Sequence, residues 1–430
     1  MRSTTSVTEF AYGEIDAHRR SLIFGLLALP FAGCSGGAAL IRAAFANFVV
    51  VWQDDRDGRV RARGFKPSGT EELFPTIQVD SASSGRQRVP GVAATIDRFV
   101  VVWVDTGDWS VRARVFNLNG TARTGVISLE INVPWETQPG TTSGDTPWYS
   151  PRVAMASDGS FVVCWDRGTG HPARARRFLA DGTGLAIVDV APPSTAGSDV
   201  AMADDGNFVV TFANPNNRRS FIRGFRPDGS IRFGATPIQI SPSLSQLEQA
   251  IAITPDGSRI VVVQGCFQEP DHQEPVLALG FDSNGNSLFS RAAPSSFAFT
   301  PGAKFAPAVA INPGGYFFAT WQDDRDGNAP NIRARLFGLD GSPIGDDLRV
   351  NSTTSGRQLF PAVGNNRGGA YVFVWQDDRS GNNDVLARGL LGDDAKTESI
   401  SETTMNDVTS GQQRMPRVAM VPPAPWTSVQ

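Results

Sequence analysis

The sequence predicts an all-β protein, a seven-bladed β-propeller of four-stranded blades. An apolar strand that ends in Trp returns several times along the 430 residues. The chain also contains 44 Gly and 29 Pro, as turn-rich β proteins do. No stretch of the repeats shows the periodicity of an amphipathic helix. Because a repeated unit outweighs the number of domains that length alone suggests, the repeats decide the architecture.

The repeat is best aligned on the last residue of its strongest strand, FVVVW in the first copy. Five copies have Trp at this position, and two copies have Phe or Gln instead. The aligned residues are Trp52, Trp103, Trp165, Phe212, Gln264, Trp321 and Trp375, at intervals of 47 to 62 residues. The chain therefore contains seven units.

Each unit has four short strand candidates, which turn signals separate. In the second unit they are residues 90–94, 99–103, 111–116 and 126–132. Side chains alternate along a strand, so both faces of FVVVW are apolar and both must be covered. With no helices to cover them, the sheets pack on one another around an axis, which is the arrangement of a propeller.

The two ends of the repeat region predict how the ring closes. The first unit starts at its second strand, whereas SGQQRMPRVAM at 410–420 matches the first strands of later units and has no second strand after it. We expect this carboxyl-terminal strand to complete the first blade, which leaves no open sheet edge there. The propeller then spans residues 48–421, and residues 422–430 form a tail.

The repeated motifs Pro-x-Val-Ala, Asp-Gly-x-Phe-Val-Val-Val-Trp, Ile-Arg-Ala-Arg-x-Phe and Asp-Gly-x-x-x-Gly resemble a repeat of bacterial secreted and cell-surface proteins that forms propeller blades. The resemblance covers nearly the whole mature chain. It implies a binding or scaffolding module more often than an enzyme. Units four and five depart from the pattern, because they lack the Trp and replace the acidic turn with residues 214–219 and 265–275.

Residues 1–33 have the features of an export signal. Arg19 and Arg20 precede an apolar run of about a dozen residues, too short to span a bilayer. The run ends at Cys34 in a sequence that resembles a bacterial lipobox, so Cys34 is the expected lipid anchor and residues 34–47 a short tether. Cleavage after Ala46 is the alternative. The expected location is accordingly a membrane-anchored lipoprotein on the periplasmic side or cell surface, or a secreted protein.

An acidic turn follows the Trp strand in units one, six and seven. Its carboxylates resemble those of calcium loops, and the candidate ligands are Asp55, Asp57, Asp324, Asp326 and Asp378. The alternative is a tight turn for which Asp and Gly are simply the preferred residues. Calcium is the one cofactor that the sequence suggests.

Pairs of Arg alternate along the third strand of several units: Arg61 and Arg63, Arg112 and Arg114, Arg174 and Arg176, Arg333 and Arg335. One interpretation is a basic surface for an anionic ligand. The other is that they pair with Asp54, Asp105, Asp166 and Asp323 on the adjoining second strand. Recurrence in nearly every unit favours the structural interpretation.

The longest link between units, residues 132–150, is the predicted ligand site. It carries Trp135, Trp148 and Tyr149 beside Glu136 and Asp145, and exposed aromatic rings with polar neighbours suit a sugar or a protein partner. The alternative is that these rings form a small satellite core. By the topology of a four-stranded blade, this link shares a face with the acidic turns.

Catalytic motifs are weak. His171 and His272 fall in different units, Cys164 lies inside an apolar strand, and the acidic residues near Cys266 are successive in one turn. A net charge of -4 gives no basis for nucleic-acid binding. The expected function is a non-enzymatic, monomeric module that binds a glycan or protein at the cell surface. The alternatives are a polysaccharide hydrolase or lyase on a propeller, and a structural spacer.

Overall fold

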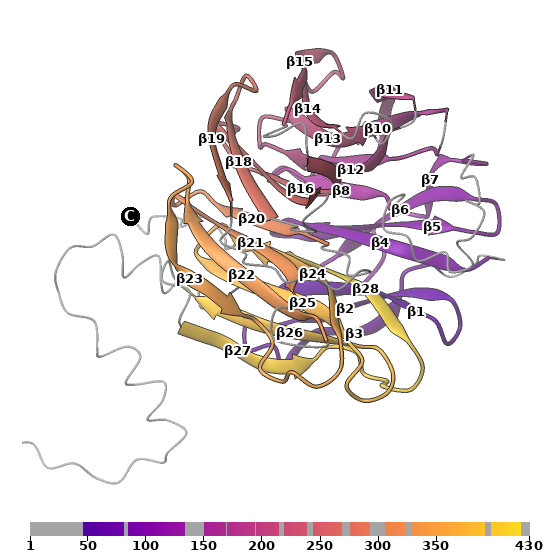
Figure 1. The fold of residues 1–430 in the computed structure, drawn as a ribbon. Coiled ribbons are helices and arrows are strands. Elements are labelled where there is room, and N and C mark those ends of the chain that lie inside the picture. Colours follow the sequence, from indigo (N-terminus) through magenta and orange to yellow (C-terminus); the bar gives the residue numbers. More distant parts are fainter. Residues whose placement is uncertain are drawn as a thin grey trace, which may run out of the picture.

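The computed structural model describes residues 46–80, 85–133, 150–168, 170–193, 195–214, 219–238, 244–268, 276–292, 306–323, 329–391 and 397–422. Every regular element in these ranges is a β-strand, and the strands form seven antiparallel sheets of four strands each. The sheets follow one another around a ring (Figure 1). The described residues include no helix that could cross a membrane. The predicted export signal and Cys34 lie outside these ranges.

In blades 2 to 7 the strands pair in chain order from the axis outwards. Blade 2 contains β4 (Gln87–Ala94), β5 (Arg98–Asp105), β6 (Ser110–Asn117) and β7 (Ile127–Glu130). Blade 3 contains β8 (Arg152–Met155), β9 (Phe161–Trp165), β10 (Pro172–Phe178) and β11 (Gly184–Pro193). Blade 4 contains β12 (Ala196–Met202), β13 (Phe208–Asn214), β14 (Arg219–Phe225) and β15 (Ile231–Pro237).

Blade 5 contains β16 (Leu244–Ile253), β17 (Arg259–Gln268), β18 (Val276–Asp282) and β19 (Ser287–Ala292). Blade 6 contains β20 (Ala308–Asn312), β21 (Tyr316–Asp323), β22 (Asn331–Gly338) and β23 (Pro343–Arg349). Blade 7 contains β24 (Gln358–Asn365), β25 (Ala370–Asp377), β26 (Asp384–Leu391) and β27 (Thr397–Thr404). Blade 1 contains β28 (Gln413–Met420), β1 (Phe48–Asp54), β2 (Arg59–Phe65) and β3 (Glu72–Gln78).

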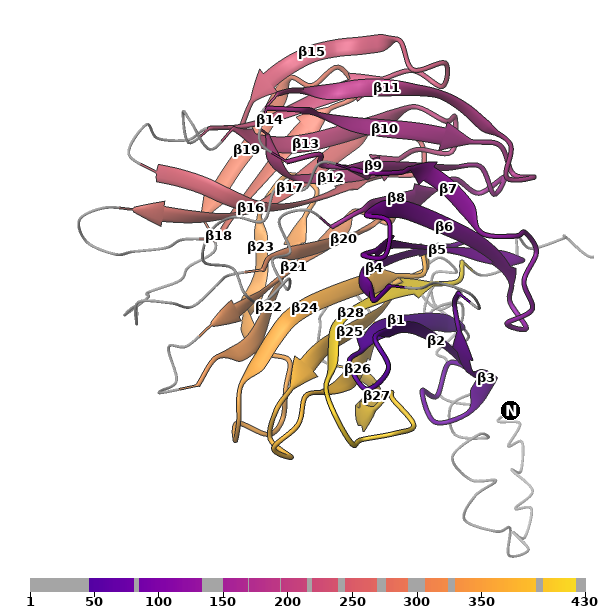
Figure 2. The ribbon, with the colours of Figure 1, turned by 90° about the vertical axis from the view of Figure 1, so that its right-hand side faces the viewer.

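The ring closes as the sequence predicts. The last strand, β28, pairs antiparallel with the first, β1, so that Arg417 lies opposite Val51 and Val418 opposite Val50. The yellow end of the chain therefore lies beside its indigo beginning (Figures 1 and 2). The strands predicted for the second unit are found as β4 to β7, with ends that differ by a few residues.

The two apolar faces of FVVVW are both buried, and they face different neighbours. Val49 and Val51 of β1 belong to a cluster with Phe99 and Val101 of blade 2. On the other face, Phe48, Val50 and Trp52 pack with side chains of blade 7. Each sheet is thus covered by the blades on either side of it. The buried core is the set of interfaces between blades, which explains why the strand is apolar at every position.

The residues that follow the apolar strand connect neighbouring blades. The Trp375 indole Nε1 donates to Asp377 at 3.3 Å, and the Trp321 Nε1 donates to Asp323 at 3.1 Å. The intervening Gln376 accepts a hydrogen bond from the backbone N–H of Met415 in β28, at 3.4 Å. The recurring Trp-Gln-Asp sequence therefore satisfies a buried indole and holds the next inner strand.

The same Gln contact recurs at the other blades that carry the motif. Gln53 accepts from the N–H of Val89 at 3.3 Å, and Gln322 accepts from the N–H of Phe360 at 2.6 Å. Each donor residue precedes a Pro and has a positive φ, for example 47° at Val89. A β-branched residue rarely adopts this conformation, so the Gln holds a strained backbone at the start of the inner strand.

The Arg pairs of the third strands are structural in most blades. Arg61 lies 3.5 Å from Asp54 and Arg112 lies 3.1 Å from Asp105, as predicted. The prediction that Arg174 pairs with Asp166 is wrong. Arg174 pairs with Glu130 of blade 2 at 2.8 Å and with Asp189 at 3.1 Å. The carboxylates that Arg174 reaches come from the outer strand of its own blade and from blade 2, and not from the adjoining second strand.

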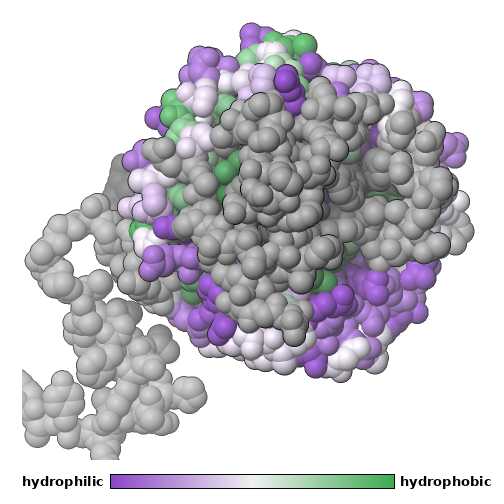
Figure 3. Space-filling view, in the orientation of Figure 1, coloured by the Kyte–Doolittle hydropathy of each residue, from purple (hydrophilic) through white to green (hydrophobic). Residues whose placement is uncertain are grey.

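The second Arg of each pair contributes to blade packing. The guanidinium of Arg63 stacks over Phe65 and donates to the carbonyl of Met405 in the link from blade 7. Arg114 does the same with Phe116 and with the carbonyl of Val79 in the link from blade 1. For the described blades, the Arg motif thus accounts for contacts within and between blades. The described surface in Figure 3 is largely hydrophilic, with hydrophobic residues in small patches.

Candidate functional site

The acidic turns are occupied by arginine side chains where the structure describes them. Asp55 lies 3.0 Å from Arg86 and 3.4 Å from Arg414. Asp378 lies 2.8 Å from Arg357, and Asp57 forms an ion pair with Arg61. Asp324 and Asp326 lie outside the described residues. Within the described ranges, no three His, Cys, Asp or Glu side chains are grouped as a metal site requires. Calcium binding at these turns stays a prediction.

The predicted ligand-binding link is not available for comparison with the structure. Trp135, Glu136, Asp145, Trp148 and Tyr149 all lie outside the described residues, as do the residues 269–275 beyond Cys266. Cys164 is fully buried in β9, as predicted. Burial raises the pKa of its thiol well above the ordinary value. Cys164 therefore serves as a small apolar core residue.

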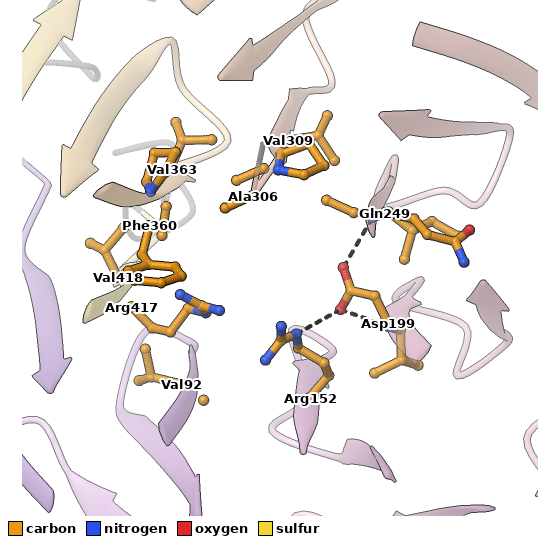
Figure 4. Close-up of a pocket in the computed structure, with 18 of the residues that line it drawn as sticks. Val92, Arg152, Asp199, Gln249, Ala306, Val309, Phe360, Val363, Arg417 and Val418 are labelled. Atoms are coloured by element: carbon orange, nitrogen blue, oxygen red, sulfur yellow. Dashed lines mark hydrogen bonds and ion pairs between the residues drawn. The ribbon is translucent and has the colours of Figure 1, made fainter. Parts of the chain in front are cut away.

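The structure reveals a different candidate site, a cavity of about 220 Å³ on the axis of the ring. The inner strands of all seven blades contribute to its wall, together with residues just before them. Figure 4 shows three charged side chains, Arg152, Asp199 and Arg417, directed into it from blades 3, 4 and 1. The remaining wall is mostly aliphatic.

Two rings of equivalent residues make up most of the wall. The first ring is the variable position of the Pro-x-Val-Ala motif, and each of its residues pairs with the residue immediately before the Trp position of the second strand. It consists of Gly91, Arg152, Asp199, Ala250, Ala308, Ala362 and Arg417. The second ring, one residue further along, consists of Val92, Val153, Val200, Ile251, Val309, Val363 and Val418.

The rings differ in symmetry. The second ring is β-branched and aliphatic in all seven blades, as a repeated packing position should be. The first ring has Gly or Ala in four blades and a charged residue in three. A residue that recurs in every blade serves the architecture, whereas a position that breaks the repeat is where a site is expected. We therefore treat the first ring, the charged ring, as the candidate functional site.

The charged residues of the ring are held by few contacts. Asp199 accepts hydrogen bonds from the backbone N–H of Val200 at 2.9 Å and of Ile251 at 3.0 Å. Its carboxylate lies 3.8 Å from the Nε of Arg152. Arg417 donates to the carbonyl of its neighbour Pro416 at 2.9 Å. Gly91 separates the two arginines in ring order and adds no side chain between them.

Burial perturbs the titration of this ring. Burial raises the pKa of Asp199, although attraction to Arg152 opposes the change. Burial, followed by repulsion from Arg152, lowers the pKa of Arg417 to about 9, against the attraction of Asp199. The guanidinium group of Arg417 is therefore still charged at neutral pH. The ring is only partly buried, since the side chains of Arg152 and Asp199 are 21% and 18% exposed.

These residues are not among the sites predicted from the sequence, although the variable position of the repeat distinguishes them. Pro-x-Val-Ala was interpreted as an architectural motif, and its variable position was not compared between units. That position reads Gly, Arg, Asp, Ala, Ala, Ala and Arg from the second unit onwards. Strand alternation alone does not indicate which side chains face the axis, since this depends on the innermost place of the strand in its blade.

Comparisons with known proteins find solved structures of low sequence identity and low structural similarity. No protein-family model and no curated protein matches the sequence. A protein from Lactobacillus plantarum is 10% identical, with 87% of this chain and 99% of that chain covered at a TM-score of 0.48. A functionally unknown protein from Desulfotomaculum acetoxidans is 12% identical, with 88% and 100% covered at 0.45. Prolyl oligopeptidase B from Galerina marginata is 11% identical, with 87% and 53% covered at 0.44. Similarities this low carry no argument about function.

Proposed function

We propose that this seven-bladed propeller is a non-enzymatic ligand-binding module that works outside the cytoplasm and holds its ligand at the axis. One observation carries the proposal: three charged residues break an otherwise small and apolar ring that faces a cavity of about 220 Å³. Blade packing has no need of these charges, since four blades have Gly or Ala at the same position. A cavity with a few convergent polar groups is the default form of a binding site.

The proposal assigns the repeats and the ring to different tasks. The Trp-Gln-Asp motif of blades 1, 6 and 7 and the Arg motif hold neighbouring blades together, so these sequences recur between units. The charged ring is free to vary because its side chains point into the cavity rather than between blades. The resemblance to bacterial surface repeats and the export signal support a place outside the cytoplasm, with a glycan or a protein as the natural source of the ligand group.

The link at 132–150 fits the same proposal. It leads directly into β8, and Ser150 lies only two residues before Arg152 of the ring. The inner strands begin on the face where the links lie. The charged ring is therefore nearer to that face than are the turns that end the inner strands.

A cavity-filling variant tests the proposal without assuming the chemistry of the ligand. Ala308→Leu adds volume to the charged ring on the side opposite the arginines and changes no charge. Wild type should bind members of a panel of glycans, peptides and small molecules, and Ala308→Leu should not. The control is Ala122→Leu, at an exposed position of blade 2. Equal binding by Ala308→Leu and wild type would place the ligand elsewhere.

The enzyme alternative needs two carboxylates that converge on the axis from different blades. Among the described residues that line the cavity, Asp199 is the single carboxylate. Release of new reducing ends from polysaccharides would establish the alternative directly. The proposed location has its own test, because Cys34→Ala should move the protein from the membrane fraction to the soluble fraction. Unchanged fractionation would remove the lipid anchor from the proposal.

A further inference from the structure

The charged ring of the axial cavity lacks one negative charge. Arg152 and Arg417 lie close enough for their charges to repel one another, and Asp199 is the one carboxylate in the ring. The formal charge of the ring is therefore +1, in a place where burial strengthens every electrostatic interaction. An anion in the cavity would restore neutrality.

Both guanidinium groups also have N–H groups that can donate hydrogen bonds to a ligand. A buried terminal nitrogen of Arg152, Nη1, has no hydrogen-bond partner among the described residues. The hydrogen bond of Arg417 goes to its own neighbour Pro416, and no carboxylate of the described residues lies within 4.0 Å of it. A buried donor without a partner is costly, which makes an acceptor between the two groups favourable. Figure 4 shows both guanidinium groups on the same side of the cavity.

The rest of the wall indicates what the anion is attached to. The ring of Val and Ile side chains lies one residue after the charged ring along each inner strand. Phe360, two residues before Ala362 of the charged ring, also lines the cavity. A ligand with a charged end and an apolar body would contact both parts. An apolar protein cavity of about 150 Å³ is large enough for benzene, so the cavity here has room for a small aromatic or branched acid.

We propose that the axial cavity binds a small organic carboxylate, with the carboxylate group between Arg152 and Arg417 and an apolar body against the ring of aliphatic side chains. A carboxylate is favoured over phosphate because the ring lacks a single negative charge, and the guanidinium groups can hold both carboxylate oxygens. The inference rests on the proposed function, since it names the ligand chemistry of the same cavity.

Isothermal titration of the full-length protein with benzoate tests the inference. Benzoate should bind, whereas uncharged benzamide should bind at least about tenfold more weakly, the effect expected for loss of hydrogen bonds to a charged group. Inorganic phosphate and glucuronate distinguish the alternatives. Tighter binding of phosphate would overturn the choice of a carboxylate, and tighter binding of glucuronate would overturn the apolar body.

Two substitutions should shift benzoate affinity in opposite directions. Arg417→Gln removes one cation and should weaken binding by about tenfold or more. Asp199→Asn removes the competing carboxylate, keeps an acceptor for the N–H of Ile251, and should leave binding as tight or tighter. The charge-matched control is Arg388→Gln, which affects a pair with Glu398 on the outer strands, 2.7 Å away. A merely structural role would weaken binding in both ring variants.

The outcome also separates this inference from the proposed function. If Ala308→Leu abolishes the binding of some other ligand but benzoate does not bind, the binding module stands and the carboxylate inference fails. If benzoate binds to wild type and to Ala308→Leu equally, the carboxylate inference fails, because benzoate does not occupy the cavity, and the proposed function is then decided by the panel of other ligands. If Arg417→Gln does not fold, Asp199→Asn and the benzamide comparison still decide the question.

Discussion

Arg367 in the β24–β25 turn donates two hydrogen bonds to Asp204 in the β12–β13 turn, at 2.7 Å and 3.0 Å. These turns belong to blades 7 and 4, which are not neighbours in the ring, so the contact is made across the axis. Asp204 also accepts from the N–H of Ser157 in blade 3, and its own N–H donates to the carbonyl of Pro255 in blade 5. Through its carboxylate and its backbone N–H, Asp204 thus connects four blades at the end of the inner strands away from the links.

Loss of this ion pair should loosen that end of the axis. Arg367 and Asp204 are each about two-thirds buried, at 28% and 31% side-chain exposure, and the pair is bidentate. A double-mutant cycle with Arg367→Gln and Asp204→Asn should give a coupling free energy of about 1 kcal/mol in urea unfolding. The exposed pair of Lys66 and Glu71 should give a coupling near zero. Equal coupling in the two pairs would contradict a special role for the cross-axis contact.

The Gln of the Trp-Gln-Asp motif should contribute measurably to the stability of the protein. In Gln376→Leu, the N–H of Met415 and the amide oxygen of Asn383, which accepts from Gln376 at 2.8 Å, both lose their partner. Buried groups left in this way cost about 1–3 kcal/mol, so the urea midpoint should fall. Gln78→Leu, at an exposed position of β3, should stay within about 0.5 kcal/mol of wild type. Similar midpoints for both variants would argue against the contact.

Removal of the last strand should disrupt the whole ring. Deletion of 412–430 takes away β28, which supplies the inner strand of blade 1 and the buried side chains of Met415, Val418 and Met420. The edge of β1 and the facing surface of blade 7 then become exposed, and exposed edges promote association. The truncated protein should aggregate or melt at a much lower temperature. An unchanged melting temperature in light scattering and calorimetry would refute closure through β28.

The architecture could be predicted from the sequence because a repeated pattern of residues determines it. The apolar FVVVW strand needs cover on both faces, and this alone requires blades packed against blades. The match between the segments at 84–93 and 410–420 predicted closure through β28. In contrast, the partner of Arg174 could not be predicted, because Glu130 reaches it from the preceding blade and no pattern within one unit indicates that contact.

The candidate site was harder to predict for a related reason. Arg152, Asp199 and Arg417 lie in three units of the sequence, 47 to 265 residues apart, and only ring closure brings them into one cavity. Their signal is a departure from the repeat, whereas the repeat itself draws attention to the acidic turns. In these turns Asp55 is paired with Arg86 of the following link, and Asp378 is paired with Arg357 of the preceding link.

The aromatic link at 132–150 gives a prediction that is independent of the cavity. If Trp135 and Trp148 contact the ligand, the double variant Trp135→Ala with Trp148→Ala should lose glycan or protein capture and keep nearly the melting temperature of wild type. If the rings form a satellite core instead, stability should fall by several kcal/mol while capture persists. Capture on an array and thermal unfolding, measured on the same preparations, distinguish the two outcomes.

Asp166 should make the stability of the protein depend on pH in an unusual direction. It lies 1% exposed at the end of β9 and accepts from the Oγ of Ser198 at 2.6 Å and from its N–H at 3.1 Å. Burial raises the pKa of Asp166 from 3.8 to about 6, although these hydrogen bonds and the charge of Arg152 oppose the change. Between these two values the folded protein binds a proton that the unfolded chain has released.

The contribution of Asp166 is therefore full below about pH 4 and is lost as the pH rises through about 6, the reverse of an ion-paired Asp. Asp166→Asn removes this titration, so its free energy of unfolding should rise relative to wild type by up to about 3 kcal/mol between pH 4 and pH 7. Asp181→Asn should show the opposite trend as the pH falls below about 4, because hydrogen bonds from Thr183 lower the pKa of that exposed carboxyl from 3.8. Urea unfolding at a series of pH values measures both differences. A difference between wild type and Asp166→Asn that stays constant from pH 4 to pH 7 would show that Asp166 keeps its ordinary pKa in the folded protein.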